Sequence, residues 1–178
     1  MPIYSTRPTP AGGGEDAVVD VFNEADQLRQ VPMLSKLDPS KLKLLAFTSE
    51  ALSYKDGDYL FRAGEPSDSA YVILDGEVDI LAQTESGEEV AVLTRGRDEL
   101  IGEMAVLSNA PRSATLKARG AVKTLRIDND TFLKLITENP AVALDVMRQL
   151  SGKLAEAHEQ VETLENRVRK LRRGGGDS

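Results

Sequence analysis

Apolar residues recur every three or four positions near the start of the chain, and this spacing predicts two amphipathic helices. The first covers about residues 15 to 30. The second covers about residues 38 to 48, where Asp38 forms an N-cap and Pro39 lies in the first turn. Residues 1 to 14 contain three prolines and three consecutive glycines, a composition that predicts a disordered leader.

Between Leu52 and Ile127 the pattern changes to short runs rich in valine, isoleucine, leucine and tyrosine, interrupted by glycine-containing turns. Such runs at about ten-residue spacing predict a β-barrel or β-sandwich. Asp75-Gly76 separates two of the runs and predicts a hairpin, because glycine adopts a positive φ without a steric cost. The clearest predicted strands are residues 70–74, 77–82 and 89–93, and predicted strands at 114–117 and 122–127 close the β region.

Helical spacing returns after the strands, with a helix capped by Asn129 and a second, long helix that begins at Asn139-Pro140 and continues to about residue 173. Residues 174–178 form a predicted disordered tail. The apolar positions of the long helix alternate in steps of three and four: Met147, Leu150, Leu154, Ala157, Val161, Leu164, Val168 and Leu171. Valine at a and leucine at d favour a parallel two-stranded coiled coil. The alternative is a helix lying along its own barrel, but a helix of this length would extend beyond the barrel, which favours a homodimer.

Composition and charge exclude several classes of function. The 178 residues carry 22 basic and 29 acidic side chains, a formal charge of −7, which disfavours broad nucleic-acid binding. There is no cysteine and one histidine, His158, so disulfides, thiol chemistry and multi-histidine metal sites are excluded. No apolar run is long enough for a membrane span, and the first residues lack the apolar stretch that is typical of a signal peptide. We therefore expect a cytoplasmic protein without a bound metal.

Residues 101–115 contain the candidate chemistry. The segment opens with Gly102 and Glu103, continues as one apolar helical turn, and returns through Pro111 to Arg112. Unpaired N–H groups at a helix start and the fork of donors on arginine both suit a phosphate, and glycine lets a ligand approach the main chain. Glu103 would repel that phosphate unless it accepts hydrogen bonds from hydroxyl groups. A phosphate and a hydroxyl together indicate a ribose phosphate.

This segment resembles the phosphate-binding cassette of cyclic nucleotide-binding domains, a family that includes the catabolite activator protein, protein-kinase regulatory subunits and nucleotide-gated channels. The similarity lies in Gly102-Glu103-Met104-Ala105 and Pro111-Arg112-Ser113-Ala114-Thr115. Gly57-Asp58, Gly64-Glu65 and residues 71–78 extend it over about residues 30 to 158. Ile101 differs from the aromatic residue found before the glycine in many members.

The resemblance implies an α+β fold in which an antiparallel β-roll, or jelly-roll barrel, has flanking N-terminal helices and a long C-terminal helix. Residues 15–139 would form the cyclic nucleotide-binding domain, and residues 140–173 would form a lid and a coiled-coil dimerisation helix.

The resemblance also implies the ligand contacts. Glu103 would accept the ribose 2′-hydroxyl, and Arg112 would pair with the exocyclic oxygens of the cyclic phosphate. Ser113 would place a hydroxyl near the phosphate or the base. The backbone of three residues would make further contacts: Gly102, Met104 and Ala105.

The base would be covered by the long helix, where counting from Asn139-Pro140 places Leu154, Ala157 and His158 opposite the purine. His158 falls at an e position of the heptad, so a solvated interfacial role is the alternative to a ligand contact. The base itself stays open: cAMP is preferred over cGMP only because it is the more frequent ligand of bacterial members.

Three functions compete at this point. The first is a homodimeric sensor that passes a nucleotide-induced change to a protein partner. The second is a structural dimer that keeps the fold without a nucleotide, with Glu103 and Arg112 forming an internal ion pair. The third is an enzyme on a small β-barrel, which the single histidine and the absence of a serine or threonine beside an evident base disfavour.

The end of the long helix carries a basic cluster: Arg167, Arg169, Lys170, Arg172 and Arg173. These charges complement the negative end of the helix dipole, and Glu165 is placed to pair with Arg169. An acidic partner or a nonspecific contact with a polyanion is the alternative explanation. No helix-turn-helix is expected after this helix, so we expect no sequence-specific DNA binding.

Overall fold

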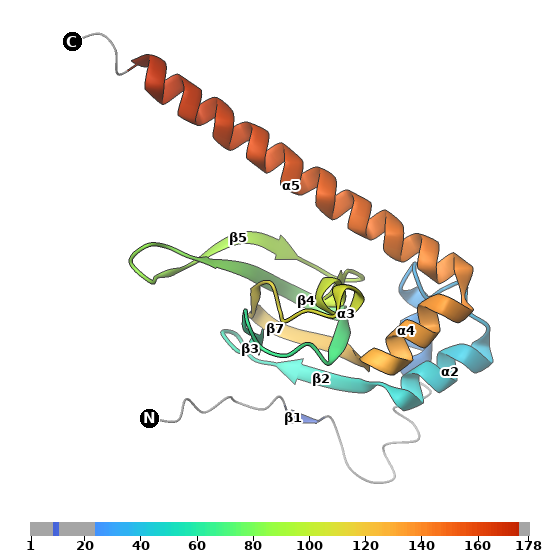
Figure 1. Ribbon diagram of the computed structural model, residues 1–178. Helices are drawn as coiled ribbons and strands as arrows, with labels where there is room; N and C mark the ends of the chain where they lie inside the picture. Colours follow the sequence, from blue (N-terminus) through green and yellow to red (C-terminus); the bar gives the residue numbers. More distant parts are fainter. Residues whose placement is uncertain (1–8, 11–23, 175–178) are drawn as a thin grey trace.

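The computed structural model describes residues 9–10 and 24–174 (Figure 1). Most of the predicted leader, residues 15–23 of the first predicted helix and the end of the predicted tail lie outside the described residues. Within them, residues 24–30 are helical, as the apolar spacing predicts. Two residues of the predicted leader form strand β1, Thr9–Pro10, which pairs with Leu52 and Ser53.

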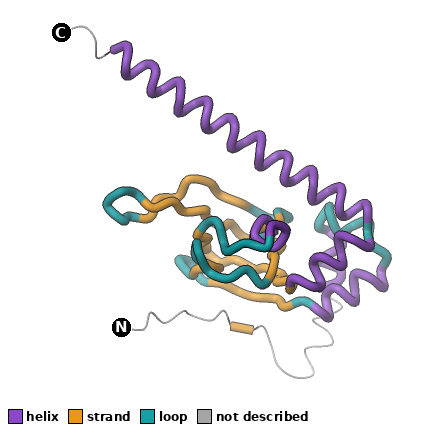
Figure 2. The backbone as a smooth tube through the Cα atoms, viewed as in Figure 1, coloured by secondary structure: helices purple, strands orange, loops and turns teal. Residues whose placement is uncertain are grey.

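The strands form one antiparallel sheet that rolls into a barrel, shown in orange in Figure 2. Their order is β1-β2-β7-β4-β5, while β3 pairs with β7 and β6 pairs with β4. Strands β4 and β7 pair along most of their length, from Ser69 opposite Asp128 to Leu81 opposite Thr115. The bounds are β2 Glu50–Tyr54, β3 Tyr59–Phe61, β4 Ser69–Gln83, β5 Glu89–Arg95, β6 Leu100–Ile101 and β7 Thr115–Asp128. The predicted β-roll is therefore confirmed.

The hairpin predicted at Asp75-Gly76 is wrong, because the chain does not reverse there. Gly76 has φ 85° and lies inside β4, where the register against β7 shifts on both sides of Asp75. A side chain at Gly76 would collide with the carbonyl oxygen of Ala121. The glycine therefore makes a bulge that bends one long strand. Likewise, the strands predicted at 114–117 and 122–127 are parts of the single strand β7, with Gly120 at φ 72° between them.

Among the described residues, the helical segment 24–30 and four further helices flank the barrel: α2 Pro39–Thr48, α3 Glu103–Ser108, α4 Asn129–Glu138 and α5 Pro140–Gly174. The N-cap of α4 is Asp128 and not Asn129 as predicted. The Asp128 carboxylate accepts hydrogen bonds from the backbone N–H of Thr131, at 3.0 Å, and from its hydroxyl, at 2.7 Å. These bonds hold the pKa of Asp128 below its usual value.

The long helix α5 has two different halves. Its first half is anchored in a core that α2, α4 and residues 24–30 form against β4 and β7, where Val142 and Val146 are buried. Its second half extends past β5 and away from the barrel (Figure 1). No helix among the described residues has the length and apolar character needed to cross a membrane.

Candidate functional site

Gly102 connects strand β6 to helix α3 and shapes the start of the cassette. Its φ of 75° is a conformation that other residues rarely adopt. A Cβ atom at this position would lie 2.6 Å from Nη1 of Arg112 and 3.4 Å from the Phe61 ring. The glycine is therefore needed both for the turn and for the close approach of the arginine.

Main-chain oxygens and aromatic rings hold the Arg112 side chain in place within the cassette. Its Nη1 donates to the Gly102 carbonyl at 3.0 Å, and its Nη2 donates to the Ser69 carbonyl at 2.7 Å. The guanidinium lies 4.2 Å from the centre of the Phe61 ring and 5.7 Å from that of Tyr71. These contacts fix the orientation of the guanidinium plane.

The charge of Arg112 is buried and only weakly compensated. The residue is 4% exposed, and burial lowers the pKa of its guanidinium, although Tyr71 and Asp68 act in the opposite direction. Arginine nevertheless stays protonated at neutral pH. Its ion-pair partner among the described residues is the exposed Asp68, at 3.8 Å, and its buried Nε has no hydrogen-bond partner. Such a group favours an anion beside it.

Asp68 is itself shared with a second arginine. It accepts from Nη2 of Arg126 at 2.9 Å and from the Ser69 hydroxyl at 2.8 Å. Burial acts to raise the pKa of Asp68, but the Ser69 hydrogen bond and Arg126 outweigh it, so the pKa is lowered. Because Asp68 pairs with both Arg112 and Arg126, it neutralises the positive charge of Arg112 only in part.

Glu103 is the second buried charge of the cassette, and it points toward α5. It is 2% exposed, and its Oε1 accepts from Nζ of Lys153 at 2.6 Å. Lys153 also donates to the Leu100 carbonyl at 2.6 Å. The internal pair between Glu103 and Arg112, considered from the sequence, is not what the structure shows, because each has a different ionic partner.

Arg112 and Glu103 line one cavity of about 450 Å³, which lies between the barrel, α3 and α5. This volume suits a small organic ligand. Eight of the nine residues predicted at the site line it: Gly102, Glu103, Met104, Ala105, Arg112, Ser113, Leu154 and Ala157. The remaining one, His158, is not among the lining residues. Its side chain is 75% exposed, and Nε2 lies 3.5 Å from Glu162.

The structure adds polar residues that the sequence interpretation missed. Lys153 and Arg95 both line the cavity, and Arg95 donates to Glu156 of α5 at 2.6 Å. Charged residues are abundant in this chain, and nothing in the local sequence pattern distinguishes Arg95, Lys153 and Glu156 from the others. The apolar part of the lining includes Phe61, Ile80, Leu93, Ile101, Leu116 and Leu150.

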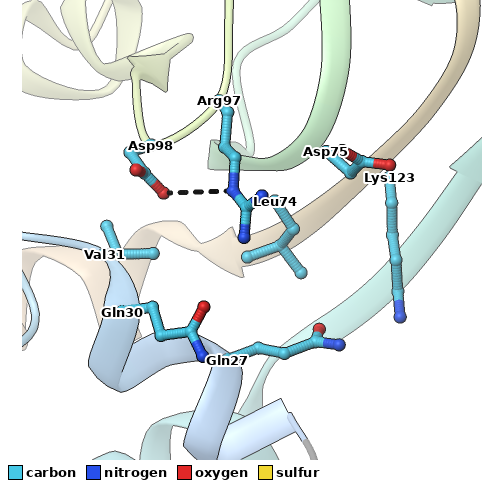
Figure 3. Close-up of a pocket in the computed structure, with 8 residues that line it drawn as sticks. All are labelled: Gln27, Gln30, Val31, Leu74, Asp75, Arg97, Asp98 and Lys123. Atoms are coloured by element: carbon cyan, nitrogen blue, oxygen red, sulfur yellow. Dashed lines mark ion pairs between the residues drawn. The ribbon is translucent and has the colours of Figure 1, made fainter.

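A second cavity, of about 460 Å³, lies between residues 24–30 and the turn after β5 (Figure 3). Its charges are of both signs, and Arg97 lies 4.0 Å from Asp98. None of its charged side chains is buried. It therefore lacks a buried and only weakly compensated charge such as that of Arg112 in the first cavity. Among the described residues, no three His, Cys, Asp or Glu side chains are placed to hold a metal ion.

The fold and the cassette place this chain in a known family. The cyclic nucleotide-binding domain family matches residues 51–139, which include all but the first residue of β2, the strands β3 to β7 and both buried charges of the cavity. The chain belongs to this family. In the described residues after Pro140 the chain forms a single helix, without a helix-turn-helix.

Individual relatives agree with this assignment. The cAMP-dependent protein kinase regulatory subunit of Blastocladiella emersonii is 33% identical over 109 residues, which is 61% of this chain and 27% of that protein. The chain thus aligns with about a quarter of that relative. A regulatory subunit of a cAMP-independent protein kinase A from Trypanosoma brucei has a TM-score of 0.66 at 27% identity, covering 84% of this chain and 53% of that one.

A bacterial sensor domain has the same fold over nearly its whole length. The sensor domain of the transcriptional regulator DNR from Pseudomonas aeruginosa has a TM-score of 0.66 at 25% identity, covering 82% of this chain and 97% of that one. Solved structures of a kinase regulatory subunit and of the sensor domain of a transcriptional regulator therefore share the fold over most of this chain.

Proposed function

We propose that this chain is a regulatory protein that binds a cyclic nucleotide, with cAMP preferred over cGMP, and passes the binding event to a protein partner. The observation that carries the proposal is the buried and undercompensated Arg112 beside the buried Glu103, in one cavity. Arg112 would bind the exocyclic phosphate oxygens, because its Nε lacks a partner and its fork of donors matches them. Glu103 would accept the ribose 2′-hydroxyl.

The remaining contacts follow from the lining of the cavity. The backbone of α3 and the Ser113 hydroxyl lie beside the expected phosphate position, and Leu154 and Ala157 of α5 would cover the base. The preference for cAMP rests on the relatives named cAMP-dependent kinase regulatory subunits. Helix α5 lines the cavity and also extends beyond it (Figure 1). A ligand that binds more tightly when α5 is in one position shifts the equilibrium toward that position, by an amount set by the difference in affinity.

The second candidate is a nucleotide-free structural dimer, and one observation favours it. Both buried charges already have protein partners, since Lys153 neutralises Glu103 and two carbonyls bind Arg112. In that case the cavity would stay without a nucleotide and the ion pairs would serve only to hold α5.

Calorimetric titration of the full chain with cAMP, cGMP and 5′-AMP separates the two candidates. The sensor proposal predicts saturable heat with cAMP, weaker binding of cGMP, and little binding of 5′-AMP, whose dianionic phosphate is not held in the ring. Absence of binding by both cyclic nucleotides at millimolar concentration would leave the structural dimer as the function. Equal affinity for the two would refute only the base preference.

We also propose that α5 forms a homodimer through its apolar seam. Four consecutive seam residues beyond the cavity are exposed: Val161, Leu164, Val168 and Leu171. They continue the heptad spacing that starts at Met147. A long helix with such a stripe is stabilised by a second apolar surface.

Leu164→Lys is expected to weaken the dimer by at least about tenfold, because it places a charge at a buried d position. The matched control is Asn166→Lys, which adds the same charge on the opposite face of the helix. Sedimentation velocity over a concentration series measures both. Identical dimer dissociation constants for the two variants, or a monomeric parent protein, would contradict the proposed seam.

A further inference from the structure

Helix α5 covers the cavity but is fastened to the barrel there by few contacts. Upstream, Val142 and Val146 are buried in the core. Past the cavity the seam residues are exposed. Between these regions, α5 is fastened to the barrel beside the cavity by three polar side chains on one face of the helix: Gln149, Lys153 and Glu156.

Two of the three bind the same residue of β6. Gln149 accepts from the Leu100 N–H at 3.1 Å, and Lys153 donates to the Leu100 carbonyl at 2.6 Å. Leu100 is fully buried, so both backbone groups would lose their partners if this part of α5 moved away. The segment around Gln149 and Lys153 is therefore held firmly, and opening of the helix is easiest beyond it.

The third contact lies one helical turn further on and is of another kind. Nη2 of Arg95, at the end of β5, donates to Oε2 of Glu156 at 2.6 Å, and Arg95 also lies 3.5 Å from Glu99. The Arg95 side chain is 11% exposed, whereas that of Glu156 is 37% exposed. The pair thus joins a half-exposed carboxylate of the lid to a nearly buried cation that lines the cavity.

We propose that the Arg95–Glu156 pair is a latch that controls how fast a cyclic nucleotide enters and leaves the cavity. This inference rests on the proposed function, because it concerns exchange of ligand at the same site. The pair fastens α5 before any ligand is present, and it is separate from the charges assigned to phosphate and ribose. If the pair is equally strong in the closed protein with and without ligand, it does not change the affinity. It must still break each time a ligand enters or leaves the cavity, so it slows both steps.

The test is stopped-flow kinetics of the full chain with cAMP that carries a fluorophore on carbon 8 of the base, so that ribose and phosphate stay unmodified. Glu156→Gln removes the charge of the latch, while Glu99 still compensates Arg95, so the variant is expected to fold. We expect the association and dissociation rate constants each to rise about threefold, with the dissociation constant changed by less than about twofold. The difference from the parent protein shrinks at high salt.

Glu159→Gln is the matched control, because Glu159 is an exposed glutamate of the same helix beyond the lining residues. It is expected to leave both rate constants unchanged. Unchanged rates in Glu156→Gln would overturn the latch while the proposed function stands. A rise in the dissociation rate alone would also overturn it, because Glu156 would then hold the ligand itself. If the parent protein binds no cyclic nucleotide, the proposed function fails first, and the latch fails with it.

Discussion

Replacing Arg112 with glutamine is expected to weaken cAMP binding by about 100-fold. A charge-assisted contact to a phosphate contributes roughly 1.5–3 kcal/mol net, and the bidentate geometry of arginine places this site at the upper end of that range. Glutamine preserves a polar side chain but removes the positive charge and the fork of donors. The dissociation constant from calorimetric titration measures the effect.

The control for this variant is Arg119→Gln. Arg119 lies in β7, is half-exposed and pairs with Asp79 away from the cavity. Its loss is expected to leave cAMP affinity within about twofold, as for an exposed ion pair. Since Arg112 also holds Gly102 and Ser69, circular dichroism must show that the Arg112 variant is folded. A folded variant with unchanged affinity would refute the role assigned to Arg112.

The cassette is predictable from sequence because its chemistry is contiguous. Gly102, Glu103 and Arg112 lie within one short segment, and the turn forced by the glycine brings them to the same cavity. The apolar spacing likewise predicts α2, α5 and the β-rich region, since each is a local periodicity. These elements agree with the structure because local preference and tertiary packing point in the same direction.

The Gly76 bulge shows where local reasoning fails. A hairpin and a bulge both need a residue with positive φ, and Asp-Gly satisfies either. Whether the chain reverses depends on β7, which offers a partner strand on both sides of Gly76. That partner lies about 45 residues further along the chain, so no window around Asp75 contains the information.

The contacts of α5 could not be predicted from the sequence for a related reason. Lys153 and Glu103 are 50 positions apart, and Arg95 and Glu156 are 61 positions apart. With 22 basic and 29 acidic side chains, many such pairs are conceivable. Only the crossing of α5 over the cavity selects these two. The functional consequence is that α5 and the carboxylate proposed to bind the ribose share one ion pair.

That shared pair leads to the second large effect. Lys153→Met is expected to lower the free energy of unfolding by about 2–3 kcal/mol, because it leaves the buried Glu103 carboxylate without its cation. The loss is expected to stay below that of a fully buried pair, since the Lys153 side chain is 17% exposed and water can replace part of its contact. Urea denaturation followed by circular dichroism measures the change.

Glu103→Gln combined with Lys153→Met separates the charge effect from lost packing. If the uncompensated carboxylate causes the instability, the double variant recovers most of the stability that Lys153→Met loses, and the coupling energy is about 2 kcal/mol. Lys170→Met, on the exposed end of the same helix, is the matched control and is expected to change stability by less than about 0.5 kcal/mol. Additive effects of the two substitutions would show that Glu103 does not depend on Lys153. In that case the carboxylate could bind a ribose without any change in α5, and this ion pair would not couple the ligand to the helix.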